Sequence, residues 1–66
     1  NMALVQSALK KIGEEQQTVL VMRFVEDLSY KEIASVLDKS EGAIRLIQHR
    51  AIQNLRKIIN SDEQFI

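Results

Sequence analysis

The sequence predicts an all-α domain of four helices, and three observations lead to this expectation. The 66-residue chain contains no proline, 45% of its residues are apolar, and most of these recur at spacings of three and four residues. Such spacing places apolar side chains on one face of a helix, whereas a half-buried strand alternates them at a spacing of two. We expect one domain over residues 1–66, with residues 1–3 and 61–66 either frayed or foreign to it.

The first two helices are expected over residues 2–12 and 14–25, separated by Gly13. The apolar stripe of the first consists of Leu4, Val5, Ala8, Leu9 and Ile12. The second begins with Glu14 and Glu15, whose charges suit the positive end of a helix dipole. Apolar residues cover most of its circumference, so this helix is either the centre of the domain or also the site of a partner.

The third helix is expected over residues 30–37, and its start is the best defined in the sequence. Ser29 and Glu32 have the spacing of a capping box, in which the serine accepts from the third helical amide and the glutamate accepts from the serine amide. Leu28 and Ile33 are placed to close over this start as a hydrophobic staple.

The fourth helix is expected over residues 41–59, with Ser40 as its N-cap and Asn60 and Ser61 at its end. Only Asp38 and Lys39 separate the third helix from this cap. A short and a long helix joined by so tight a turn predict a helix-turn-helix in the C-terminal half of the chain.

The net charge of the chain is zero, but the charges are unevenly distributed. Residues 14–41 carry seven acidic and three basic side chains, whereas residues 42–60 carry four basic and no acidic ones. One face of the fourth helix is apolar, with Ile44, Ile47, Ala51, Leu55 and Ile58. The opposite face holds Gly42, Arg45, Leu46, His49, Arg50, Gln53, Arg56 and Lys57. A solvated face normally mixes both signs of charge, so this pattern favours a helix that lies in the major groove of DNA.

The candidate DNA-binding residues are Tyr30, Lys31, Lys39, Ser40, Glu41, Gly42, Arg45, Leu46, His49, Arg50 and Gln53. Arginine pairs with guanine, glutamine with adenine, and an exposed leucine contacts a thymine methyl group. Gly42 permits a close approach to phosphate, and the amide ends of the third and fourth helices are suitable phosphate sites. For Tyr30, packing and phosphate contact both remain open.

Other classes of function receive little support. The chain has no cysteine and one histidine, so we expect no metal site, cofactor or catalytic residue. The longest apolar run is four residues, Val19–Met22, which predicts no membrane association. A module that binds only protein, with the helix-turn-helix as its scaffold, is disfavoured by the acid-free outer face.

Several motifs together resemble region 4 of bacterial sigma factors, most closely the extracytoplasmic-function group. The resemblance covers about residues 4–57 and is carried by the runs at residues 12–24, 27–34 and 40–45, by His49-Arg50-Ala51 and by Leu55-Arg56. It implies a bacterial cytoplasmic protein that directs transcription initiation by recognising the −35 promoter element. It also implies that the first two helices dock on the flap of core RNA polymerase or on an anti-sigma factor. For that interface we select Leu9, Val19, Met22 and Phe24. A LuxR-type regulator, which has a similar Glu-Ile-Ala turn, is the alternative.

Overall fold

The computed structural model describes the backbone of residues 2–63, and the side chains of these residues other than 2, 4, 5 and 61–63. Its elements are α1 (Met2–Lys11), α2 (Glu14–Leu20), the π-helix η1 (Val21–Val25), α3 (Tyr30–Leu37) and α4 (Glu41–Glu63). The expected all-α architecture with four helical segments is confirmed. The side chains of Leu4 and Val5, and residues 1 and 64–66, lie outside the described part, and so do the predictions made for them.

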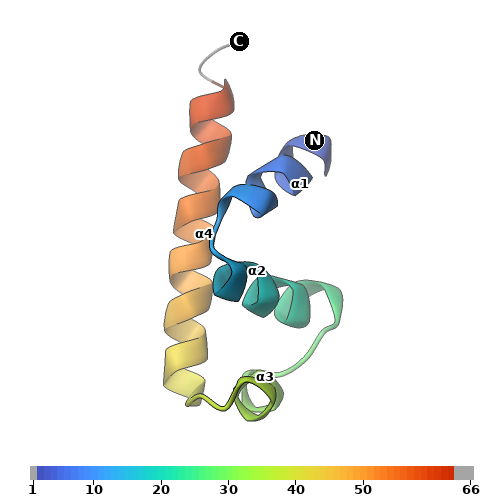
Figure 1. The fold of residues 1–66 in the computed structure, drawn as a ribbon, viewed down its shortest axis with the longest axis vertical. Coiled ribbons are helices and arrows are strands. Elements are labelled where there is room, and N and C mark those ends of the chain that lie inside the picture. Colours follow the sequence, from blue (N-terminus) through green and yellow to red (C-terminus); the bar gives the residue numbers. More distant parts are fainter. Residues whose placement is uncertain (1, 64–66) are drawn as a thin grey trace.

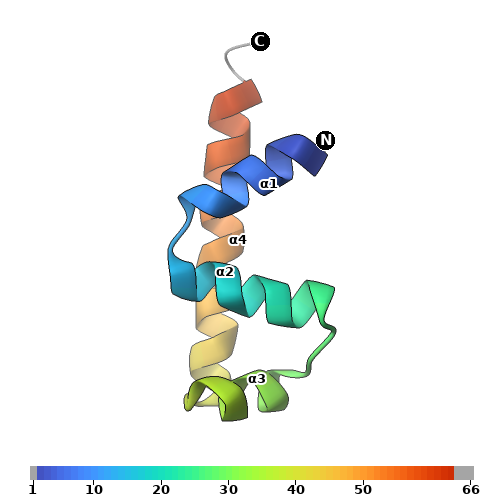
Figure 2. The same cartoon turned by 45° about the vertical axis from the view of Figure 1, so that its right-hand side comes forward.

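Helix α4 runs the length of the molecule, and α1, α2 and α3 lie one after another along one side of it (Figures 1 and 2). Besides Ala8 of α1, the buried apolar side chains of the described residues form two groups. The first group is Val19, Ile33, Ala34 and Ile44, and the second is Ile12, Leu20 and Ala51. Ile44 and Ala51 both come from the apolar face predicted for α4. This face is therefore the one against which α1, α2 and α3 pack.

The caps at the starts of α3 and α4, and the turn between the two helices, form as the sequence predicts. The Ser29 amide donates to Glu32 Oε1 at 2.9 Å, and the Glu32 amide donates to Ser29 Oγ at 3.1 Å, which completes the capping box. Ser40 Oγ accepts from the amide of Ala43 at 3.1 Å. Between these caps, Asp38 adopts a left-handed conformation with φ of 55°. Such a residue after the last turn is a common way for a helix to end.

The segment expected as one helix over residues 14–25 divides into α2 and η1. In η1 the amide of Glu26 donates to the carbonyl of Val21 at 3.0 Å, five residues back rather than four. Asp27, with φ of 58°, then turns the chain out of the helix. The apolar periodicity of this segment predicted the helical span but not its widened last turn.

The predicted end of the fourth helix at Ile59 is wrong, because α4 continues to Glu63. Asn60 and Ser61 are only moderate helix formers, and neither removes a backbone donor as proline does. Two such residues therefore do not end an established helix. Within residues 2–63, no helix is long and apolar enough to span a bilayer.

Candidate nucleic-acid interface

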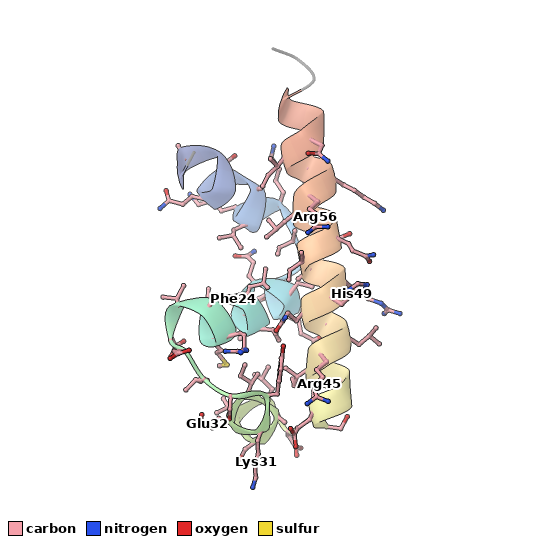
Figure 3. All side chains as sticks on the ribbon, turned by 180° about the vertical axis from the view of Figure 1, so that it is seen from behind. Phe24, Lys31, Glu32, Arg45, His49 and Arg56 are labelled. Atoms are coloured by element: carbon pink, nitrogen blue, oxygen red, sulfur yellow. The ribbon has the colours of Figure 1, made fainter. Side chains whose placement is uncertain are left out.

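The side of α4 that faces away from α1, α2 and α3 is uncovered by any other helix of the described chain (Figure 1). The residues predicted on this outer face, from Gly42 to Lys57, are all exposed. Arg45, His49 and Arg56 project from the same helix in Figure 3. The outer face is thus a continuous surface with cationic and amide side chains and no carboxylate between Glu41 and Asp62.

The amide ends of α3 and α4 lie at the same end of the molecule (Figure 2). Lys31, Ser40 and Glu41 are exposed there, and the Lys31 side chain points away from the rest of the molecule in Figure 3. The first amides of a helix lack intrahelical acceptors and attract anions. The surroundings of both amide ends are therefore exposed, although the amides of Glu32 and Ala43 already donate to the Ser29 and Ser40 caps.

Gly42 has no structural requirement within the chain itself. Its φ is not positive, and an added Cβ would meet nothing nearer than Ser40 Oγ at 4.0 Å. Neither backbone conformation nor internal packing therefore requires glycine at this position. A close approach from outside the chain is consistent with the lack of a side chain.

The structure pairs one of the candidate residues with another part of the fold. Lys39 Nζ lies 3.1 Å from Glu15 Oε2, at the start of α2. Lys39 is exposed, but its ammonium group is already bound to a carboxylate. Because an ammonium group has three donor hydrogens, a phosphate can contact Lys39 beside Glu15 or in its place.

Tyr30 lies at the centre of a cluster that joins three elements. The guanidinium carbons of Arg23, from η1, and Arg45, from α4, each lie 5.0 Å from the centroid of its ring. A hydrogen bond from Arg23, then one from Gln48, and the positive charges of Arg23 and Arg45 lower the pKa of the Tyr30 hydroxyl below its ordinary value. Tyr30 also packs against the core group around Ile33, so the packing role left open for it is confirmed.

Arg23 and Gln48 are members of this cluster that the sequence analysis did not select. Arg23 Nη1 also lies 3.8 Å from Asp27 Oδ1, and it donates to the carbonyl of Leu28 at 3.5 Å. The Arg23 Nε and Gln48 Oε1 atoms are buried and have no hydrogen-bond partner within the described residues. The spacing of Arg23 and Asp27, four residues apart, was the only sequence signal for this arrangement.

The residues selected for a protein interface separate into different environments. Val19 is fully buried among Ile33, Ala34 and Ile44, so its selection as an interface residue was wrong: its side chain does not reach the surface. Met22 is half-buried against the same core group. Phe24 remains 61% exposed.

Leu9 and Phe24 meet at an apolar groove of about 420 Å³ between α1, the α2–η1 segment and α4. The residues lining this apolar groove are Leu9, Leu20, Val21, Phe24, Val25, Ile52 and Leu55. Val21 and Val25, which the sequence analysis did not select, are 39% and 76% exposed. The surface thus holds a second candidate site, apolar and separate from the outer face of α4.

Comparison with known proteins decides the family. Residues 8–57 match the family described as Sigma-70, region 4. The chain belongs to the sigma-70 region 4 family. Its relatives place this region 4 domain in the extracytoplasmic-function group, and the match decides against a LuxR-type regulator.

The region 4 domain is similar to several named sigma factors. It is 37% identical over 55 residues to the extracytoplasmic-function RNA polymerase sigma factor BldN of Streptomyces coelicolor, covering 83% of this chain and 21% of BldN. It is 36% identical over 59 residues to RNA polymerase sigma-E factor of Streptomyces avermitilis, covering 89% of this chain and 33% of that protein. Sigma factors are not enzymes. The chain spans about a fifth to a third of the length of these two relatives.

A solved structure has the same fold. A chain in the structure of the RsbN–BldN complex superposes on this region 4 domain with a TM-score of 0.81 and 36% identity, covering 85% of this chain and 41% of that one. The arrangement of helices is therefore shared with a sigma factor that was solved in a complex with another protein.

Proposed function

We propose that this region 4 domain recognises promoter DNA of the −35 type by inserting the outer face of α4 into the major groove. The observation that carries the proposal is the exposed face from Gly42 to Lys57, which presents cations and amides and no acid. In this orientation the α3 and α4 amide ends face the phosphate backbone.

The candidate residues divide by the part of DNA that each type of side chain recognises. Arg45, Leu46, His49 and Gln53 are proposed to contact base edges, and Arg50 is proposed to lie beside them along the groove. Lys31 and Lys39 are proposed to hold the DNA backbone through their charge, and Ser40, Glu41 and Gly42 through helix-end amides. Tyr30 is linked to the base-contacting group indirectly, through its contact with Arg45.

A salt titration tests this function directly. The chain is titrated with duplexes selected from a library with a randomised window, and binding is measured from low to moderate salt. With about four to six cations on phosphates, the logarithm of the binding constant should fall with a slope of about −3.6 to −5.4 against the logarithm of salt. Arg45→Ala should cost about 1–3 kcal/mol on the preferred duplex and relax the preference at one base pair. No binding to any duplex at low salt would contradict the proposal.

We also propose that the apolar groove docks the flap of core RNA polymerase or an anti-sigma factor. The proposal is supported by the seven apolar residues that line the groove and by the exposed side chain of Phe24. Exposed apolar patches of this kind mark interaction sites on soluble domains. BldN, a relative, was solved in a complex with RsbN. Both roles belong to transcription initiation, which takes place in the bacterial cytoplasm.

A further inference from the structure

The arginine proposed to read a base does not extend freely from α4. Its guanidinium carbon lies 5.0 Å from the ring centroid of Tyr30, which is the first residue of α3. Arg45 is exposed, and a long charged side chain on a helix surface would otherwise sample many rotamers. The ring therefore provides a fixed surface against which the guanidinium rests.

The ring itself is held from three directions. The capping box of Ser29 and Glu32 fixes the backbone of α3 directly at Tyr30. One side of the residue packs against the buried group of Val19, Ile33, Ala34 and Ile44. The guanidinium of Arg23, from η1, lies at the same 5.0 Å from the ring centroid as that of Arg45. Tyr30 is thus restrained by contacts from η1, from α3 and from the core.

We infer that Tyr30 is a positioning residue whose ring orients the Arg45 guanidinium for bidentate contact with a base, so that it sets base preference without reading the base itself. The inference rests on the proposed DNA-binding function and deepens it. A guanidinium that is ordered before binding loses less freedom in the complex. Because bidentate pairing depends on the orientation of the planar guanidinium, this ordering acts on specificity more than on general affinity.

A competing role for Tyr30 is direct contact between its hydroxyl and a phosphate. The two roles depend on different parts of the side chain. Tyr30→Phe removes the hydroxyl and keeps the ring, whereas Tyr30→Leu removes the ring and keeps an apolar body to pack against the core. Lys31→Ala, at the next position of the same helix, serves as a matched control for the loss of a phosphate contact.

The experiment measures binding of the 66-residue chain to the duplex selected from a randomised library and to each single base-pair variant of it. The base pair read by Arg45 is the one at which Arg45→Ala loses preference. We expect Tyr30→Leu to relax the preference at that same pair by about two- to fivefold, the strength of an exposed cation–π contact. Tyr30→Phe should retain this preference, and Lys31→Ala should weaken all duplexes about equally.

Three results would overturn the inference. Equal weakening of every duplex by Tyr30→Leu, or equal effects of Tyr30→Phe and Tyr30→Leu, assigns Tyr30 to phosphate contact while the proposed DNA binding stands. An absence of duplex binding by the unmodified chain overturns the proposed function and this inference together. The same set of titrations distinguishes these results from one another.

A second measurement needs no variant and no DNA. NMR spectra of the unmodified chain should show the Arg45 side-chain protons shifted upfield by the Tyr30 ring, and slow motion at the Arg45 Nε–H relative to Arg50. Arg50 is also exposed on α4 and provides the internal reference. Unshifted Arg45 protons with the same fast motion as Arg50 would show that the ring does not order the guanidinium.

Discussion

The ammonium group of Lys39 lies 3.1 Å from a carboxylate oxygen of Glu15, which joins the turn of the helix-turn-helix to the start of α2. The two residues are far apart in the sequence, and both side chains are partly exposed. An exposed pair of this kind contributes about 1 kcal/mol or less to folding. In the proposed DNA complex, the charge of Glu15 therefore matters more for binding than for stability, because it neutralises an ammonium group that faces phosphate.

Glu15→Gln should consequently strengthen duplex binding. The slope of the binding constant against salt should steepen by up to the amount expected for about one added phosphate contact. The stability change should stay within about 1 kcal/mol. Glu14→Gln is the matched control, since it removes the same charge from the neighbouring exposed residue. Salt-dependent binding and thermal melting of both variants check the prediction. An equal gain from both variants would attribute the effect to net charge rather than to the release of Lys39.

The capping box should make the stability of the chain dependent on pH. The hydrogen bond from the Ser29 amide, with a further bond from its side chain, lowers the pKa of Glu32. Because the folded pKa is lowered, the stabilisation is fully present above the ordinary glutamate pKa and is lost as the pH falls through the folded value. Glu32→Gln keeps an acceptor but does not titrate.

Melting temperatures of the unmodified chain and Glu32→Gln, measured from about pH 7 to about pH 3, test this expectation. The melting temperature of the unmodified chain should exceed that of Glu32→Gln most at neutral pH, and this difference should decline in acid. A difference that is constant across the whole range would show that ionised Glu32 contributes no more than a neutral acceptor.

The parts of this fold that sequence analysis predicted are those determined by local chemistry. The capping box at Ser29 and the cap at Ser40 depend on residues three positions apart, and the two faces of α4 depend on its helical period. Each is readable because the interacting residues are neighbours along one helix.

The features that it missed depend on contacts between elements. Arg23 and Gln48 belong to different segments and meet only at Tyr30, so no local pattern reports their proximity. Val19 resembles its apolar neighbours in sequence, yet the packing of α3 and α4 buries it completely, while the same packing leaves Phe24 at the surface. Periodicity distinguishes apolar from polar faces, but it does not distinguish a core contact from a partner contact when a helix is apolar on most sides.

Gly42→Ala should change stability and DNA binding in opposite directions. Gly42 lies in the first turn of α4 with open space at the Cβ position. Alanine there should stabilise the chain by up to about 1 kcal/mol, because glycine has the more flexible unfolded state. The added methyl group should weaken duplex binding by obstructing the close approach of the DNA backbone.

Gly13→Ala provides the control for this prediction. Gly13 also has open space at the Cβ position, but it caps α2 and does not belong to the outer face of α4. We expect this variant to bind DNA as the unmodified chain does. Thermal melting and duplex titration of both variants give the two readouts. Undiminished DNA binding by Gly42→Ala would mean that the backbone of α4 does not approach phosphate closely at this position.

Phe24→Ala should strongly weaken protein docking while the domain remains folded and binds DNA. The Phe24 side chain is 61% exposed and lines the apolar groove, so its removal creates no cavity in the core. Aromatic residues at the centre of an interface often contribute about 2 kcal/mol or more to binding. Val36→Ala is a close control, because Val36 is equally exposed and lies on α3 outside the groove.

Binding of each variant to an isolated flap domain of bacterial RNA polymerase is measured by calorimetry, with melting temperature and duplex affinity recorded in parallel. Phe24→Ala should lose at least about thirtyfold in flap affinity, the equivalent of that free energy, whereas Val36→Ala should lose little. Equal losses in the two variants would remove the apolar groove as the docking site, because the effect would then follow from exposed apolar area rather than from its position.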